Sequence, residues 1–287
     1  MTDDAPGKTS ARTVDSHHHF WDLTRFDYPW MPPGDNVLRR NYLPQDLAPL
    51  LRRNGISHTV LVQAHQSVAE ARFLLDLAEA NDFVAGVVAW VDLASPDVGR
   101  VLDRLARRPK LVGIRHLVHD EPDEAWLMRE DVIAGLKELA RRGLAYDLLL
   151  RTRHLKYVPP LVERVPDLRM VVDHIAKPRI ADGALEPWAT DIAAVADIPG
   201  VYCKLSGLVT EADHAGWRVE DLKPFVSHVV DRFGLDRLMF GSDWPVCLLA
   251  ASSYGRVLRA ALDAVGPISA AEKARLMGGA AIEFYRL

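Results

Sequence analysis

A short apolar run near the N-terminus ends in three histidines, and two of them are spaced to act together. His17 and His19 are two positions apart, so on a β-strand both side chains point to the same side while His18 points away. A third nitrogen and a carboxylate would complete the mixed ligand set that suits zinc or a similar divalent ion with an open position. His174 and Asp243 each follow an apolar run of their own. We therefore expect one divalent ion, with zinc as the first choice, held by His17, His19, His174 and Asp243.

Polar and ionisable residues follow the other apolar runs as well. Gathering so many of them in one place is costly unless they bind something, so their positions mark a candidate site. In chain order they are Asp15 to His19, Gln63 to His65, Asp92, Arg115 and His116, Tyr146 and Asp147, Asp173 and His174, Lys204 to Ser206, and Ser242 and Asp243.

The elements that must position these residues are about eight short β-rich runs, apolar on both faces as buried parallel strands are. They lie at 13–15, 58–63, 83–92, 111–115, 144–150, 168–173, 201–205 and 237–240. Helical patterns separate them, with apolar residues at three- and four-residue spacing. Ser67 and Glu70 predict a capping box before the helix at 71–78, Ser95 and Pro96 predict another helix start, and Ser269 with Glu272 opens the last helix.

Eight strands alternating with helices over roughly 250 residues are typical of a (β/α)8 TIM barrel of the α/β class. A doubly wound open sheet is the alternative, but even spacing and the lack of a G-x-G-x-x-G turn after the first strand favour the barrel. We expect one domain at 13–287 after a disordered tail at 1–12. The long loop at 21–41 is expected to form a lid or a pocket wall over the active face.

Composition excludes several classes of function. The net charge of −4 gives no overall positive field for nucleic acid or an anionic membrane, and the basic cluster at 107–110 is interpreted as a solvated helix end. No apolar stretch approaches the ~18 residues of a membrane span. Cys203 and Cys247 are far apart without a CxxC pattern, which predicts neither disulfides nor a zinc knuckle and favours the cytoplasm. The other histidines are expected to have no catalytic role, namely His58, His119, His154, His214 and His228.

Several segments resemble a known family. The sequences VDSHHHFWD at 14–22, VDHIAKP at 172–178 and FGSDWP at 240–245 resemble the amidohydrolase-2 branch of the amidohydrolase superfamily. The segments CKLSGLVTEAD at 203–213 and SDWPVCLLAA at 242–251 are similar to its sugar-acid lactonase group, which includes L-fucono-1,5-lactonase and L-rhamnono-lactonase. The resemblance runs from Val14 nearly to the C-terminus. It implies a distorted barrel, hydrolysis at a carbonyl and a small-molecule lactone as partner.

The resemblance also implies roles for individual residues. His17 and His19 match the metal pair of the first strand, His174 the histidine of the sixth strand, and Asp243 the aspartate that takes a proton from the attacking water. The fifth strand ends without the Lys, Glu or His of two-metal members, so a two-metal centre is not expected. Some members of this branch, such as the pyrone-dicarboxylate lactonase, act without metal. In that case His174 and Arg115 would polarise the carbonyl.

We predict a hydrolase that opens a sugar-acid lactone similar to L-fucono-1,5-lactone, with Asp243 as general base. Residues expected to contact the substrate are Trp30, Trp90, Trp244, His116 and Lys204, since aromatic faces suit sugar rings and the polar groups suit hydroxyls. Core filling remains an alternative for the tryptophans. Ion pairing with Asp92 or Asp147 remains an equal alternative for Arg115 and Lys204.

Rival functions remain at this point. A dicarboxylate lactonase of aromatic degradation would need several arginines at the strand ends, where this chain offers chiefly Arg115 and Arg151. A decarboxylase of the same superfamily would want a metal histidine on the fifth strand, which is missing. A catalytically silent sugar- or metal-binding barrel would need no general base. A homo-oligomer stays open because sequence alone shows no surface patch.

Overall fold

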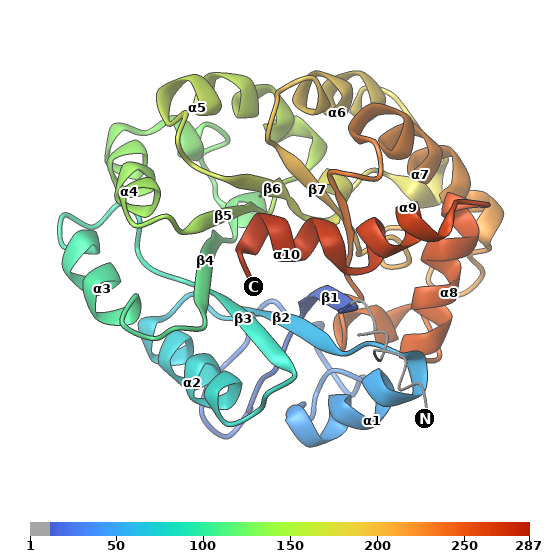
Figure 1. Ribbon diagram of the computed structural model, residues 1–287, viewed down its shortest axis with the longest axis horizontal. Coiled ribbons are helices and arrows are strands. Elements are labelled where there is room, and N and C mark those ends of the chain that lie inside the picture. The colour runs from blue at the N-terminus through green and yellow to red at the C-terminus, as the bar shows by residue number, and fades with distance from the viewer. Residues whose placement is uncertain (1–11) are drawn as a thin grey trace, which may run out of the picture.

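The computed structural model describes residues 12–287, in which eight parallel strands form one sheet whose order follows the chain. The predicted tail at 1–12 lies outside the described residues except for Arg12. The strands alternate with helices that surround the sheet (Figure 1). Their bounds are β1 (Val14–His18), β2 (His58–Val62), β3 (Val84–Ala89), β4 (Leu111–His116), β5 (Ala145–Leu148), β6 (Met170–Val172), β7 (Tyr202–Leu205) and β8 (Leu238–Phe240).

The sheet closes between its first and last strands, which confirms the (β/α)8 barrel and excludes the open sheet. His18 pairs with Trp244 in a parallel bridge. The N–H of His19 donates to the carbonyl of Trp244 at 2.7 Å, and the N–H of Asp243 donates to that of His17 at 2.8 Å. Register shifts between β1 and β2, β2 and β3, and β3 and β4 distort the barrel. The closing bonds therefore belong to the same residues that were predicted to bind metal.

The outer helices begin and end largely where apolar periodicity predicts. Their bounds are α1 (Pro44–Asn54), α2 (Val68–Glu79), α3 (Val98–Leu105), α4 (Glu130–Arg141), α5 (Val158–Arg164), α6 (Trp188–Ala196), α7 (Val219–Phe233), α8 (Tyr254–Val265), α9 (Ala270–Ala274) and α10 (Ala280–Tyr285).

One predicted helix start and one predicted capping box need correction. Helix α3 begins at Val98 after Asp97 rather than at Pro96, because Ser95 instead accepts a bond from the N–H of Asp97 within the preceding turn. Ser67 does accept the N–H of Glu70 at 3.0 Å. The Glu70 carboxylate, however, turns away from Ser67 and accepts the N–H of Ala64 and of His65. The capping box at Ser269 and Glu272 is confirmed.

The interior of the barrel is apolar toward the N-terminal ends of the strands. There, side chains such as Val60, Val112 and Val171 pack against Phe284 and Tyr285 of α10. Figure 1 shows α10 lying across the barrel opening. Gly278, just before α10, approaches the backbone of Arg12 and Thr13 so closely that a Cβ would lie 2.3 Å from the Arg12 carbonyl oxygen. The C-terminal segment thus closes the end of the barrel at which β1 begins.

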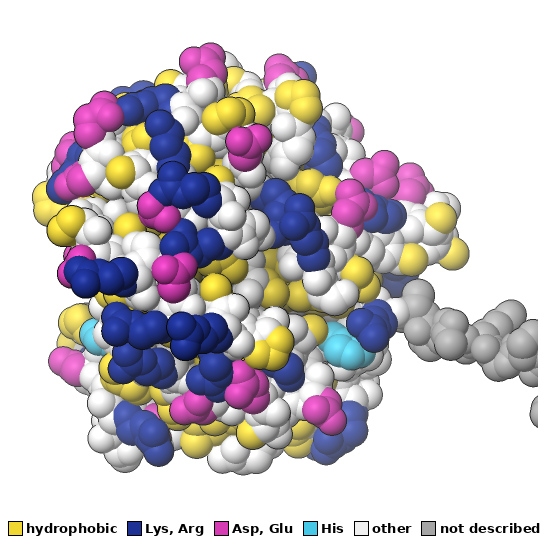
Figure 2. All heavy atoms as spheres, turned by 60° about the vertical axis from the view of Figure 1, so that its left-hand side comes forward, with side chains coloured by type: hydrophobic (Ala, Val, Ile, Leu, Met, Phe, Trp, Pro, Cys, Tyr) yellow, Lys and Arg dark blue, Asp and Glu magenta, His cyan; other side chains and the backbone are white. Residues whose placement is uncertain are grey.

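The basic cluster at 107–110 lies beside the C-terminus of α2. Arg108 pairs with Asp76 at 2.9 Å and with Glu79, and the Lys110 ammonium donates to the carbonyl of Ala78 at 2.6 Å. Cations at this position complement the partial negative charge of a helix end. On this side of the molecule, positive and negative side chains are interspersed (Figure 2). No helix in the described part of the chain is long and apolar enough to cross a membrane.

Candidate active site

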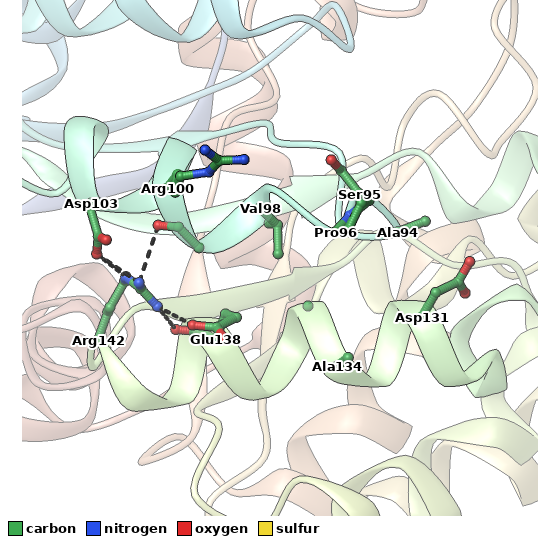
Figure 3. A pocket seen from close by; sticks show the side chains of 12 residues that line it. Ala94, Ser95, Pro96, Val98, Arg100, Asp103, Asp131, Ala134, Glu138 and Arg142 are labelled. Atoms are coloured by element: carbon green, nitrogen blue, oxygen red, sulfur yellow. Dashed lines mark hydrogen bonds and ion pairs between the residues drawn. The ribbon is translucent and has the colours of Figure 1, made fainter.

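The predicted chemistry-bearing residues meet at a pocket of about 240 Å³, where β1, β4, β6 and β8 end. His19, Arg115, His174 and Asp243 line it, together with Trp30 from the long loop after β1. A larger hollow of about 500 Å³ lies between α3 and α4 (Figure 3). Arg142 spans that hollow and pairs with Asp103 and Glu138, so these three charged groups already have partners. The chemistry therefore belongs to the barrel pocket.

Three side chains from β1 and β8 converge at the edge of the pocket. The Nε2 atoms of His17 and His19 lie 3.3 Å apart, and Asp243 Oδ1 lies 3.8 Å from the first and 3.3 Å from the second. We call His17, His19 and Asp243 the upper triad. Asp243 has a left-handed backbone with φ of 53°, a conformation that non-glycine residues adopt at a cost and that clusters at functional sites.

The orientation of His19 makes the upper triad fit a cation. His19 Nδ1 lies 2.8 Å from the carbonyl oxygen of Val62, which can only accept, so Nδ1 carries the proton and donates. Its Nε2 atom faces the Asp243 carboxylate at 3.3 Å, a position at which a positive charge is stabilised. Fixing a ligand histidine through its second nitrogen is how proteins orient metal ligands.

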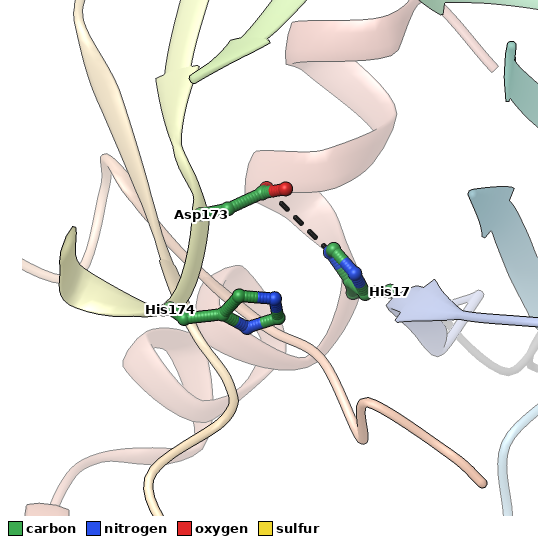
Figure 4. A group of neighbouring side chains, drawn as sticks. All are labelled: His17, Asp173 and His174. Carbon is green, nitrogen blue, oxygen red and sulfur yellow. Dashed lines mark ion pairs between the residues drawn. The ribbon is translucent and has the colours of Figure 1, made fainter. Parts of the chain in front are cut away.

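A second cluster lies deeper in the barrel and shares His17 with the first. His17, Asp173 and His174 place their ligand atoms within 4.8 Å of one another, and we call them the lower triad (Figure 4). Among the described residues, the four predicted ligands thus divide between two triads instead of forming one set. Asp173 was noted at a strand end but was not predicted as a ligand.

Burial sets the charge states of these groups. It lowers the pKa of His174 to about 3, so this imidazole is neutral at pH 7. Burial also lowers the pKa of His17 well below its usual value, and the nearby Lys204 and His174 act in the same direction. For Asp243, burial raises the pKa, but His174 and the contact with His19 outweigh it, so the pKa is lowered. The pocket thus presents neutral imidazoles and an ionised carboxylate, the states that both metal binding and base catalysis need.

The backbone around His174 holds its ring against β7. His174, Ile175, Ala176 and Lys177 all have positive φ between 46° and 60°. His174 Nδ1 lies 2.8 Å from Ser206 Oγ. A Cβ at the neighbouring Gly207 would lie 2.7 Å from the same nitrogen. The ring therefore fits only because residue 207 has no side chain.

Two further predicted residues also line the pocket. Trp30 faces it with its Nε1–H donating to the carbonyl of Ala64 at 2.7 Å, so this part of the loop forms the predicted pocket wall. Arg115 lines it while its Nη1 lies 3.1 Å from Asp173 Oδ2 and 3.2 Å from His17 Nε2.

Four of the predicted substrate contacts are not among the residues that line the pocket. Trp90 donates to His116, which in turn stacks on Trp126 at 4.0 Å. Trp244 is buried among aromatic side chains, including Tyr42. Lys204 is fully buried and pairs with Asp147, as its ion-pair alternative anticipated. Trp90, His116, Trp244 and Lys204 thus have protein partners in this structure, and their contact with substrate stays a prediction.

The pocket also contains residues that the sequence analysis did not select. All of them follow the ends of β4, β5 and β6, in turns too short to show hydrophobic periodicity. They are His119, Asp120, Arg151 and Lys177. His119, which was expected to have no catalytic role, places Nε2 3.2 Å from Asp120 Oδ2 in the pocket wall. Lys177 pairs with Glu211 at 3.0 Å.

A family model described as amidohydrolase matches residues 14–287, which is nearly the whole described chain. The chain belongs to the amidohydrolase family. This amidohydrolase is 41% identical over 282 residues to L-fucono-1,5-lactonase of Burkholderia ambifaria, with 96% of this chain and 95% of the relative covered. It is 40% identical over 289 residues to L-fucono-1,5-lactonase of Burkholderia multivorans, with 96% and 97% covered.

A solved structure agrees with the fold. A crystal structure of an amidohydrolase from Burkholderia multivorans with bound zinc superposes with a TM-score of 0.90 at 40% identity. The match covers 96% of this amidohydrolase and 100% of that chain.

Proposed function

We propose that this amidohydrolase opens a sugar-acid lactone, L-fucono-1,5-lactone or a close relative, by attack of water on the ester carbonyl. The observation that carries the proposal is the ionised Asp243 facing His17 and His19 at the edge of the pocket. At about 240 Å³ the pocket is smaller than the ~300–1,000 Å³ typical of drug-sized ligands, which suits a single ring. Two relatives at about 40% identity carry the name L-fucono-1,5-lactonase.

The chain supplies both a base and a cation for the reaction. Asp243 takes a proton from water as the oxygen bonds to the carbonyl carbon, and the carbonyl oxygen gains negative charge. Arg115 faces that charge with a guanidinium already held by Asp173 and by the Gln63 carbonyl. The ring C–O bond then breaks, and Asp243 returns the proton to the ring oxygen. The product is an open hydroxy acid.

The upper triad fits one divalent ion, for which we propose zinc. His17, His19 and Asp243 would hold it with two nitrogens and one oxygen, leaving room for a further ligand. When bound, the ion supplies Lewis-acid polarisation of the carbonyl and lowers the pKa of water. The Arg115 Nη1 atom 3.2 Å from His17 Nε2 brings positive charge to the same edge of the pocket from the chain itself.

The charge of the pocket favours a neutral lactone over a dicarboxylate. Arg115 is paired with Asp173, and Lys177 is paired with Glu211. Within the described residues this leaves Arg151 as the lining cation without an ion pair. A substrate with two carboxylates would lack a second partner. We also propose a reducing compartment, the cytoplasm, because Cys203 and Cys247 are both buried free thiols.

The test is proton release on a panel of five- and six-membered aldonolactones, before and after chelation and after zinc is restored. Opening of L-fuconolactone or a neighbouring sugar lactone supports the proposal. Loss on chelation with recovery in zinc assigns the ion to the reaction, whereas activity that survives chelation assigns carbonyl polarisation to Arg115. If sugar lactones were not hydrolysed while dicarboxylate lactones were, the proposed class of sugar-acid lactone substrates would be overturned.

A further inference from the structure

Lys204 of β7 is a fully buried lysine in the middle of the barrel. Its ammonium lies 2.5 Å from Asp147 Oδ2 and 3.0 Å from Asp173 Oδ1, and the side chains of all three residues are 0% exposed. Arg115 Nη1 lies 3.1 Å from the other oxygen of Asp173. An unpaired ion at this depth would cost several kcal/mol, but two cations here meet two carboxylates. The Tyr285 hydroxyl of α10 also donates to Asp147 Oδ2 at 2.7 Å.

The same ammonium occupies the lower triad. Besides Asp173 Oδ1, it lies 3.2 Å from His17 Nδ1. Two of the three residues that could hold a metal in the lower triad therefore have an atom within hydrogen-bond distance of Lys204 Nζ. A divalent ion and an ammonium cannot share this position, because each requires the lone pairs that the other would use and their charges repel.

We propose that Lys204 is a positioning residue that replaces a second metal ion: its ammonium fills the lower triad and neutralises Asp173, whose Oδ1 lies 3.5 Å from His17 Nδ1. The positive charge in the lower triad thus comes from a lysine side chain and not from a metal ion. A divalent ion is confined to the upper triad. The inference depends on the proposed function only in placing His17 at the active site, and it needs no activity measurement.

Replacing the lysine tests this directly. In Lys204→Met the side chain keeps much of its length and loses its charge, which frees Asp173 Oδ1 and His17 Nδ1 while Arg115 still holds Asp173 Oδ2. We expect this variant to bind one more zinc ion per chain than the wild type, counted by elemental analysis after equilibration with zinc. Its thermal midpoint should also rise with zinc by more than that of the wild type, because the metal restores the missing positive charge.

Three further variants separate positioning from general damage. Lys204→Arg keeps the charge and should keep the zinc count of the wild type. Tyr285→Phe removes only the hydroxyl that contacts Asp147 and should do the same. Lys204→Met combined with Asp147→Asn removes one charge of each sign, so it is the variant best able to fold without zinc, and it should also bind the additional ion.

The zinc counts decide the outcome. Folded Lys204→Met with the same zinc count as the wild type would overturn the proposal. A folded double variant without the additional ion would do so as well, and so would failure of Lys204→Met to fold in zinc, because the ion should replace the lost positive charge. Two zinc ions in the barrel pocket of the wild type would equally contradict it. None of these results depends on which lactone is hydrolysed, so the lactonase proposal stands or falls separately.

Discussion

At the scale of single residues, Asp243 carries the proposed chemistry. Asp243→Asn keeps the shape of the side chain and removes the base, so turnover should fall by about 10²–10⁴-fold, the usual effect of losing a general base. The backbone bond from its N–H to His17 remains, so folding should be unchanged. Proton release on the responsive lactone measures turnover, and thermal melting measures folding. Turnover near the wild-type level would remove Asp243 from this role.

Gly207 supports His174 by the absence of a side chain. Gly207→Ala would place a Cβ 2.7 Å from His174 Nδ1 at a φ of +63°, so it should displace the ring and lower turnover by at least about tenfold, the effect of misplacing catalytic geometry. Gly183→Ala is the matched control, since its φ is +64° with no atom within 4 Å. Both variants should lose about 1–2 kcal/mol from left-handed strain. Equal turnover in the two would mean that the position of the His174 ring in the pocket does not affect the reaction.

At the scale of elements, the sequence predicts the strands well because each is a buried apolar run with a polar end. It also predicts which polar ends come together, since His17, His19, His174 and Asp243 all lie at the candidate site. It could not show that Lys204 is tied to Asp147 and Asp173, because which groups face one another across the barrel depends on register and strand tilt.

Side chains in short turns were the least predictable. His119 and Arg151 reach the pocket from irregular segments after β4 and β5, where no hydrophobic period indicates which way a side chain points. Glu70 has the spacing of a capping residue, yet its carboxylate satisfies the N–H groups of Ala64 and His65 instead. Competing local partners of this kind are decided by three-dimensional packing.

His154 lies in the 3₁₀ turn at Thr152–Tyr157 that follows Arg151, and it gives this element a pH dependence. Its Nδ1 accepts the N–H of Arg151, which requires an unprotonated nitrogen. Burial lowers the pKa of His154 from its ordinary value of 6.5 to about 4. Between these values the unfolded chain binds a proton that the folded chain does not. The stability that the folded chain gains by keeping His154 unprotonated is therefore fully present above pH 6.5. It is lost as the pH falls toward 4.

His154→Asn should flatten that part of the stability curve. The variant keeps a side-chain acceptor but cannot titrate, so the wild type should lose up to about 3 kcal/mol more than the variant between neutral pH and pH 4. Urea unfolding at a series of pH values measures this difference. Parallel curves for the two proteins would show that His154 has an ordinary pKa in the folded state.

At the scale of the whole molecule, the two ends of the barrel have different tasks. The C-terminal ends of the strands carry the pocket, and α10 closes the opposite end by packing on the aliphatic interior. Such a division is general for this fold, in which one face carries activity and the other stability. The buried chain of Tyr285, Asp147, Lys204 and Asp173 connects the two ends.

Substitution of Phe284 tests whether stability at the closed end of the barrel can be changed without changing activity at the pocket. Phe284 is buried at the closed end beside Tyr202, so Phe284→Ala should lower the free energy of unfolding by about 3–5 kcal/mol, the cost of a large cavity. Ile282→Ala on the same helix is the control, since Ile282 is only partly buried and should lose less. In the folded fraction, kcat and KM should match the wild type for both variants, because neither side chain lines the pocket and Phe284 meets the buried chain only at the ring of Tyr285, 4.8 Å between centroids, while the Tyr285 hydroxyl still contacts Asp147. A fall in kcat for Phe284→Ala at temperatures where it is fully folded would show instead that α10 positions the active site through packing as well as through Tyr285.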